Sequence, residues 1–439
     1  MRASTRLLTV ITVILASAIP ISSVVASSAT PTASTSIAPD NGGVLLDGYG
    51  GLHAFGGASL TTNGSPYWAG WDIARAVSIM PGGAGGWTLD GYGGVHSWGA
   101  APPISAPMYS ADPSARAPAY WPGWDIARAL VVLPDKVSGY ELDGYGGLHN
   151  FGAAPPLLTP VYWGWDIARG LAIHMATTGQ PDGGYVLDGW GGIHNFGAAP
   201  YLSSSHYTLG VDLARQFHLL GAGAYEVTRF GLLEPIANPS AMSIGNYPNW
   251  GSWDIVRDVF PLGSTTTASF TAPQPTRAQV SGLIAFFQNA DRNVRGIVSL
   301  TEDNRLDAIA GNGQAYNLNG CGAPNVVIPD RTGDMLTRSY FGHPIPGCTA
   351  GHYSFNTYMP LLGISYRTAG ENIAWTSASP SVLDNVRSIN NAWLNSSDHL
   401  ANITNGAYHS VGCGYADSPA TSYQGFSGHV EVFACEFTG

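Results

Sequence analysis

Between residues 43 and 262, aspartate, tryptophan, histidine and arginine return at fixed places in two repeated phrases. One is a hairpin phrase, as in Asp47-Gly-Tyr-Gly-Gly-Leu-His53, and the other is a Trp-Asp phrase, as in Trp71-Asp-Ile-Ala-Arg75. Aromatic faces and carboxylates are the groups that glycan pockets use, so the pattern permits sugar binding. A residue that returns in every repeat more often braces a turn or packs between repeats, and we prefer that interpretation for the Asp, Trp and Arg positions. The histidines lack metal-ligand spacing, and they are His53, His96, His149 and His194.

The repeats have a period of about 45 residues, which is in the range of propeller blades. The array begins with a hairpin phrase that has no Trp-Asp strand before it, and it ends with a Trp-Asp strand that has no hairpin after it. If the last strand completes the first hairpin, the sheets close into a ring without exposed edges. The sequence therefore predicts an all-β repeat domain over residues 43–262, a five-bladed β-propeller. The alternative is an open solenoid with polar terminal repeats.

Export is predicted from the first residues of the chain. Arg2 and Arg6 precede an apolar stretch from Leu7 to Ala16, and small residues follow at 25–29. Residues 1–30 are therefore predicted to be a removable signal peptide, with an uncleaved anchor as the alternative. No later segment has the length and apolarity of a membrane span. We expect a secreted or cell-envelope protein.

The charge of the chain argues against one class of partner. Its formal net charge is −11, and Lys136 is the only lysine among 439 residues. The chain therefore has no basic patch that could neutralise phosphates, and nucleic acid is not an expected partner.

All four cysteines lie in the last third of the chain, which suits two disulfides in one exported domain. A hairpin centred on Gln424-Gly425 would place Cys413 opposite Cys435, and this is the preferred bridge. Cys321 and Cys348 would then pair, although four cysteines allow three connectivities.

Residues 263–275 are rich in Thr and Pro and read as a linker to a second domain over residues 276–439. A capping-box pattern at Thr276 predicts a helix whose inner face includes Phe287 and Val294. Thr301 is expected to open a second helix, and a third is expected after Ser379. Two alternating strands are predicted near the C-terminus.

Six motifs in this second domain resemble bacterial members of the CAP superfamily, the relatives of cysteine-rich secretory, antigen five and pathogenesis-related proteins. They occur in the same order as in that family: Phe287-Gln-Asn-Ala-Asp-Arg292, the helix after Leu300, Tyr340-Phe-Gly-His343, Ala369-Gly-Glu371-Asn-Ile-Ala374, Trp393-Leu-Asn-Ser396-Ser-Asp-His399 and Val411-Gly-Cys-Gly-Tyr415. The resemblance implies an α/β/α sandwich with a central antiparallel sheet and a cleft lined by His and acidic residues. It assigns His343, Glu371 and His399 to that cleft, with Ser396 in the place of a second glutamate.

Two functions follow from this assignment. The resemblance implies that His343, Glu371 and His399 could hold zinc or another divalent metal for hydrolysis, but side-chain hydrogen bonding among them is the simpler interpretation. The sequence has no Gly-x-Ser-x-Gly and no His-Glu-x-x-His motif. We therefore expect a non-enzymatic binding protein, with a glycan, lipid or surface protein of the cell envelope as partner. A secreted metal-dependent hydrolase is the alternative.

Overall fold

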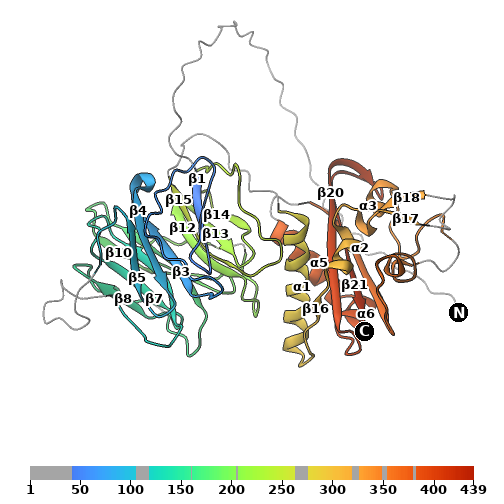
Figure 1. The fold of residues 1–439 in the computed structure, drawn as a ribbon, viewed down its shortest axis with the longest axis horizontal. Helices are drawn as coiled ribbons and strands as arrows, with labels where there is room; N and C mark the ends of the chain where they lie inside the picture. The colour runs from blue at the N-terminus through green and yellow to red at the C-terminus, as the bar shows by residue number, and fades with distance from the viewer. Residues whose placement is uncertain are drawn as a thin grey trace, which may run out of the picture. The chain divides into compact units, whose positions relative to one another are not determined.

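The computed structural model describes residues 42–104, 118–159, 161–203, 206–262, 275–318, 326–348, 353–378 and 382–439. The strands up to residue 262 are drawn in blue to yellow-green in Figure 1, and the mixed helices and strands from residue 275 in yellow to red. The predicted signal segment and nearly all of the predicted linker lie outside the described residues. The predicted domain boundaries therefore stay predictions.

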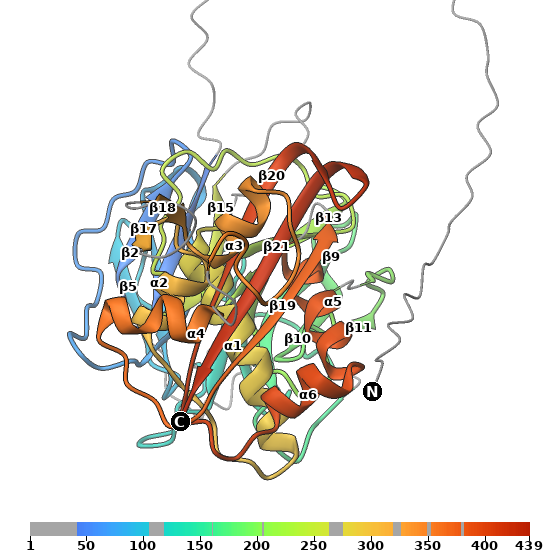
Figure 2. The ribbon, with the colours of Figure 1, turned by 90° about the vertical axis from the view of Figure 1, so that its right-hand side faces the viewer.

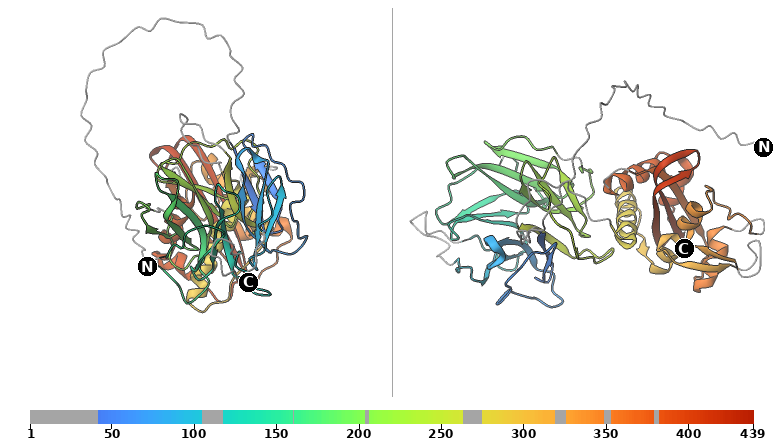
Figure 3. Two further views of the ribbon diagram at one scale, coloured as in Figure 1. Left: turned by 90° about the vertical axis from the view of Figure 1, so that its left-hand side faces the viewer. Right: turned by 90° about the horizontal axis from the view of Figure 1, so that it is seen from above.

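The repeat region forms five three-stranded antiparallel sheets, drawn in blue to yellow-green in Figure 3. In each sheet the strand after a Trp-Asp phrase pairs with the following hairpin, as the repeat order predicts. The strands by sheet are β15 (Val256–Leu262), β1 (Gly42–Asp47) and β2 (Leu52–Phe55); β3 (Ala74–Ile79), β4 (Gly85–Asp90) and β5 (Val95–Gly99); β6 (Ala127–Val132), β7 (Gly139–Asp143) and β8 (Leu148–Phe151); β9 (Ala168–Met175), β10 (Pro181–Asp188) and β11 (Ile193–Gly197); β12 (Ala214–Leu220), β13 (Gly223–Thr228) and β14 (Leu233–Ile236). A short 3-10 helix, η1 (Pro81–Gly83), joins β3 to β4.

The first and last strands of the region meet in one sheet. β1 pairs with β15 in antiparallel register, with Val44 opposite Phe260. The strands that follow the Trp-Asp phrases also contact one another in sequence, from β3 through β6, β9 and β12 to β15 and back to β3. The predicted complementarity of the two ends is therefore present in the strand pairing.

The aspartate of each hairpin phrase braces its own turn. Asp47 Oδ1 accepts hydrogen bonds from the backbone N–H groups of Tyr49 and Gly51, at 2.8 and 2.9 Å. Its other oxygen lies 2.8 Å from Nε2 of His53. The turn also needs Gly50, whose φ of +92° is costly for any residue with a Cβ. The same bonds recur at Asp90, Asp143 and Asp188. These Asp and His positions therefore have a structural role.

The arginine of each Trp-Asp phrase links its sheet to the next. Arg257 Nε donates to Asp72 Oδ1 at 3.0 Å, and Arg75 Nε donates to Asp125 at the same distance. The equivalent pairs continue around the region and return to the first sheet: Arg128 with Asp166, Arg169 with Asp212, and Arg215 with Asp254. We call these five pairs the Arg–Asp cycle. The preceding hairpin carries Gly48 at the point of contact because a Cβ there would collide with the Asp72 carboxylate.

Breaking the Arg–Asp cycle should destabilise the repeat region. Arg257→Ala is expected to lower its free energy of unfolding by about 1–3 kcal/mol, because the guanidinium is almost buried and bonds two aspartates. Urea unfolding followed by tryptophan fluorescence measures this loss. Arg305→Ala is the control because Arg305 is exposed in its ion pair with Asp303, so it should change stability far less than Arg257→Ala. Equal effects of the two substitutions would contradict a structural role for the cycle.

The C-terminal part is a four-stranded sheet between two layers of helices (Figure 2). The strand order is β16 (Thr301–Glu302), β20 (Ser410–Tyr423), β21 (Phe426–Thr438) and β19 (Ala369–Ser377). α1 (Arg277–Val294) and α5 (Val382–Leu394) pack on one face, and α2 (Asn304–Gly311) and α3 (Arg331–Thr337) pack on the other. Side chains alternate between the faces, so Phe433 and Cys435 join the α1 and α5 core while Val432 and Ala434 pack near α2 and α3. The remaining elements are β17 (Ala315–Leu318), β18 (Val326–Pro329), α4 (Ser354–Thr357), η3 (Met359–Leu362) and α6 (Ser397–Ile403).

The predicted hairpin and its disulfide are confirmed. Gln424 and Gly425 both have positive φ, at 50° and 82°, as a two-residue hairpin turn requires. The register from this turn places Cys413 opposite Cys435, and the two form a disulfide. Cys321 lies outside the described residues, so its predicted bridge to Cys348 stays a prediction.

Three helical predictions can be compared with the structure. The capping box at Thr276 is confirmed, since its side chain accepts from Gln279 N–H and Gln279 accepts from the Thr276 N–H. Val294 was expected on the inner face but is exposed, because α1 ends there. Thr301 does not open a helix. It pairs with Ser410 in the parallel strand β16, and Asp303 caps α2 instead, so the sheet is not wholly antiparallel.

Among the described residues, no helix combines the length and apolarity needed to cross a membrane.

Candidate functional site

The strand β19 places Glu371 in a buried ion pair. Its carboxylate accepts hydrogen bonds from Nε and Nη2 of Arg331, the latter at 3.2 Å, and lies 2.7 Å from Nδ1 of His343. Burial opposes ionisation, but the Arg331 charge and the hydrogen bonds with His343 and Arg331 outweigh it and lower the pKa of Glu371 to about 2. Glu371 is therefore a fixed negative charge, shared between one buried cation and one accessible imidazole.

Arg331 orders the loop that carries His343. It lies at the start of α3, and its side chain is fully buried. One arm of the guanidinium donates to the Tyr340 hydroxyl at 2.6 Å, and the other donates to the carbonyl oxygens of Gly342 and His343, at 2.5 and 3.0 Å. The nearby Glu371 charge raises the Arg331 pKa above its usual range, against the effect of burial. His343 is thus presented from a loop tied to the core, with 44% of its side chain exposed.

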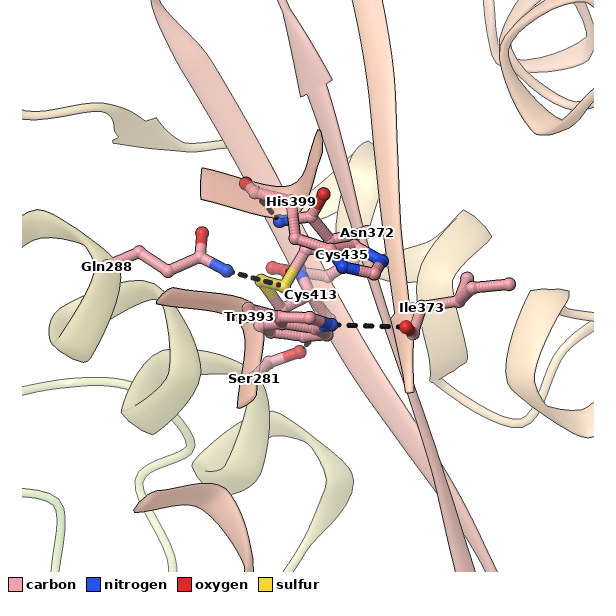
Figure 4. Close-up of a disulfide and its surroundings, with 9 residues drawn as sticks. Ser281, Gln288, Asn372, Ile373, Trp393, His399, Cys413 and Cys435 are labelled. Carbon is pink, nitrogen blue, oxygen red and sulfur yellow. Dashed lines mark hydrogen bonds between the residues drawn. A yellow bond between two sulfur atoms is a disulfide. The ribbon is translucent and has the colours of Figure 1, made fainter. Parts of the chain in front are cut away.

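His399 comes from the other side of β19. Successive strand residues point to opposite faces, so Asn372 faces away from Arg331, and its side-chain amide donates to the His399 carbonyl at 3.1 Å (Figure 4). Nδ1 of His399 lies 2.8 Å from the hydroxyl of Ser396, the N-cap of α6. Burial, and then the positive charge of His343, lower the pKa of His399. β19 is an edge strand of the sheet.

No motif marks the second buried carboxyl group, which lies beside Glu371. Glu436 lies directly opposite Glu371 in the β19–β21 register and is fully buried. Ser354 donates to it at 2.7 Å. Burial and the Glu371 charge raise the pKa of Glu436 well above its usual value. The site therefore combines one carboxyl group whose ionisation is favoured by its partners and one whose ionisation is opposed by burial and by its neighbour.

The structure places the four residues that the sequence assigned to the cleft in two separate hydrogen-bonded pairs. Glu371 bonds His343, and Ser396 bonds His399. Within the described part of the chain, no group of three or more His, Cys, Asp or Glu side chains is placed to hold a metal ion. Arg331 explains this result for Glu371, because its guanidinium already occupies both carboxylate oxygens. The arrangement favours an ordered hydrogen-bonding site over a preformed three-ligand metal centre.

The low pKa of Glu371 predicts acid sensitivity in the C-terminal part. The folded pKa of about 2 is below the usual value of 4.5, so the stabilisation is complete above pH 4.5 and is lost as the pH falls towards 2. Glu371→Gln should therefore cost about 3 kcal/mol at pH 7 and progressively less below pH 4.5. Urea unfolding at several pH values measures the difference. Asp398→Asn, at an exposed position, should differ from wild type by a small, constant amount, and a pH-independent cost of Glu371→Gln would contradict the ion pair.

Comparisons with known proteins agree with this architecture. Residues 351–437 match the family model described as CAP, the cysteine-rich secretory protein family. The chain is 30% identical over 163 residues to YkwD of Bacillus subtilis (strain 168), a protein of uncharacterised function. That match covers 37% of this chain and 52% of YkwD, so the chain spans about half the length of this relative.

Two solved structures are also similar. One is an extracellular protein containing an SCP domain from Bacillus anthracis str. Ames, with 14% identity and a TM-score of 0.27 over 61% of this chain and 80% of that one. The other is a cysteine-rich secretory protein from Staphylococcus aureus subsp. aureus Mu50, with 12% identity and a TM-score of 0.24 over 63% of this chain and 84% of that one.

Proposed function

We propose that this protein, whose residues 351–437 match the CAP family model, is a secreted, non-enzymatic binding protein of the cell envelope. Export is supported by the signal-like segment at residues 1–30 and by the Cys413–Cys435 disulfide, since disulfides persist mainly in oxidising compartments.

The repeat region is the recognition part in this proposal, and its five sheets are the blades of a β-propeller. The observation that carries the proposal is the Arg–Asp cycle, which runs from each sheet to the next and returns from Arg215 to Asp254 in the sheet of β1. The pairing of β1 with β15 supports the same closure. A closed ring of repeats holds its surface loops in fixed positions and presents an equivalent loop in each repeat. This arrangement suits recognition of an envelope glycan or protein.

The CAP cleft offers a second ligand site. The imidazole of His343 is accessible, and the Glu371 carboxylate behind it is paired with Arg331. A ligand at His343 would therefore meet an ordered surface of modest polarity. A lipid, glycan or surface protein of the envelope suits such a site, and its identity depends on the loops around His343 and His399.

Co-sedimentation of the mature chain tests the proposal. The protein is mixed with isolated cell walls and, separately, with membrane vesicles from the source organism, and the bound fraction is measured. We expect saturable retention that heat-denatured protein does not show. Failure to bind either preparation would overturn the proposed binding function.

A metal-dependent hydrolase is the second candidate, and one observation favours it. Glu371 contacts Nδ1 of His343, as carboxylates behind metal-binding histidines do, and this leaves Nε2 available. Zinc or another divalent metal held by His343 and His399 would polarise a carbonyl and activate water. Elemental analysis of the purified protein, compared with the His343→Ala/His399→Ala variant, tests this candidate. A stoichiometric metal that the variant loses would support it, and no metal in either protein would remove it.

A further inference from the structure

Four of the five repeat sheets carry a pair of aromatic rings at equivalent positions, in which the tryptophan of the Trp-Asp phrase is exposed and its partner is half-buried. The tryptophan of the Trp-Asp phrase meets, edge to face or tilted, the aromatic residue of the hairpin turn in the same sheet. The centroid separations are between 5.3 and 5.9 Å. We call these the aromatic pairs, and they are Trp71 with Tyr92, Trp124 with Tyr145, Trp165 with Trp190, and Trp253 with Tyr49.

Each tryptophan contacts the hairpin turn of its own sheet, which agrees with the predicted bracing role, but it is also half exposed. Their exposed fractions are 49% for Trp71, 48% for Trp124, 46% for Trp165 and 50% for Trp253. A tryptophan is costly to leave half exposed, and its repetition at four equivalent places calls for a ligand rather than for packing.

Each exposed tryptophan is followed directly by an anchored carboxylate. Asp72, after Trp71, is 41% exposed and is held by Arg75 from its own sheet and by Arg257 from the neighbouring one. Asp125 and Asp166 are held in the same way and are 39% and 37% exposed. Each aromatic pair therefore has a hydrogen-bond acceptor beside it that cannot swing away.

The remaining sheet provides an internal comparison. The positions equivalent to Trp71 and Tyr92 are Val211 and Phe230, and both are buried, with 6% and 5% exposure. The Arg–Asp cycle nevertheless passes through Asp212 and Arg215 in this sheet. The cycle therefore does not need the exposed aromatic rings, and the two features have separate roles.

We propose that the aromatic pairs bind the pyranose rings of a neutral, β-linked polysaccharide at several points along its chain. This inference rests on the proposed binding function of the repeat region and names its ligand class. The axial C–H groups of β-linked glucose or N-acetylglucosamine form an apolar face that stacks on tryptophan, and the ring hydroxyls donate to the adjacent aspartate. Four equivalent sites suit a polymer with a repeating unit better than they suit a protein surface, which seldom presents one epitope four times.

The charge of the chain selects a neutral polymer. The repeat region contains the only lysine of the protein, Lys136, and its repeated arginines are committed to the Arg–Asp cycle. A uronic-acid or phosphate-bearing polymer would need a cation of its own, whereas the arginines of the cycle are already bonded to the aspartates. Individual contacts of this kind are weak, so the affinity must come from several sites acting together.

Binding to insoluble chitin and cellulose tests the inference. The mature chain is compared with four single Trp→Ala variants, with the combined Trp71→Ala/Trp124→Ala/Trp165→Ala/Trp253→Ala variant and with Tyr201→Ala as the matched control. Tyr201 is 78% exposed in the same region but is not part of an aromatic pair. Each single variant should weaken retention on one of the two polymers about threefold to tenfold, the combined variant should abolish it, and Tyr201→Ala should leave it unchanged.

The outcomes separate this inference from the proposed function. Retention by cell walls with no retention on chitin or cellulose, or equal retention of wild type and the combined variant, would overturn the polysaccharide inference and leave the binding function standing. No retention on any of these materials would overturn both. The thermal unfolding midpoint of the combined variant is compared with that of wild type. Equal midpoints would show that a loss of binding does not result from unfolding.

Discussion

Replacing Arg331 with methionine is expected to cost the C-terminal part about 3–5 kcal/mol of stability. The substitution keeps much of the side-chain volume but leaves the Glu371 carboxylate buried without its cation. It also removes the donors that hold the carbonyl oxygens of Gly342 and His343. The free energy of unfolding, measured with urea and followed by far-UV circular dichroism, gives the size of the loss.

A second substitution identifies the cause of that loss. If the unpaired charge is responsible, Arg331→Met/Glu371→Gln should be more stable than Arg331→Met alone, because it removes the orphaned carboxylate. Arg295→Met is the control, since both side chains of its ion pair with Asp291 are partly exposed. Additive effects of Arg331→Met and Glu371→Gln would show that the two side chains do not act as a pair.

Removal of the Cys413–Cys435 bridge is expected to cost about 3 kcal/mol. The bridge joins β20 to β21 inside the α1 and α5 core, where both sulfur atoms are buried and Gln288 donates to Cys435 Sγ at 3.2 Å (Figure 4). Cys413→Ala/Cys435→Ala removes the crosslink and also leaves the space of two sulfur atoms beside Trp393. Thermal unfolding of the variant and of wild type under non-reducing conditions measures the effect.

Cys413→Val/Cys435→Val separates the crosslink from the packing. Valine fills much of the lost volume, so this variant should be more stable than the alanine variant. It should still be less stable than wild type, because the crosslink is absent. Recovery of full wild-type stability by the valine variant would mean that the bridge contributes through its volume alone.

Local signals in the sequence were sufficient for the hairpins and caps. The Gln424-Gly425 turn fixed the register that unites Cys413 and Cys435, and the pattern at Thr276 identified the start of α1. These features depend on residues close together in the chain, where turn geometry and capping leave few choices. The order of the two repeated phrases likewise predicted that β15 pairs with β1.

Residues that act across long distances gave no such signal. Arg331 and Glu436 reach Glu371 from different parts of the chain, and neither stands in a motif that marks it as a partner. A repeated tryptophan is equally compatible with packing between sheets and with display on the surface, so the pattern around Trp71 could not decide its exposure. At Thr301 a local signal was misleading. The sequence there resembles a helix start, but the backbone of Thr301 pairs with Ser410 in β20 instead, and this tertiary contact overrides the local preference.

The sharing of one sheet by β1 and β15 fixes when the repeat region can finish folding. β1 and β2 are the first strands of the repeat region to be synthesised, whereas β15, the third strand of their sheet, is the last. The first hairpin must therefore wait, with one edge unpaired, until the final repeat arrives, and such distant contacts form slowly. A chain that crosses the membrane unfolded and folds afterwards meets all of its strands at once, so export suits this topology better than stepwise folding during synthesis.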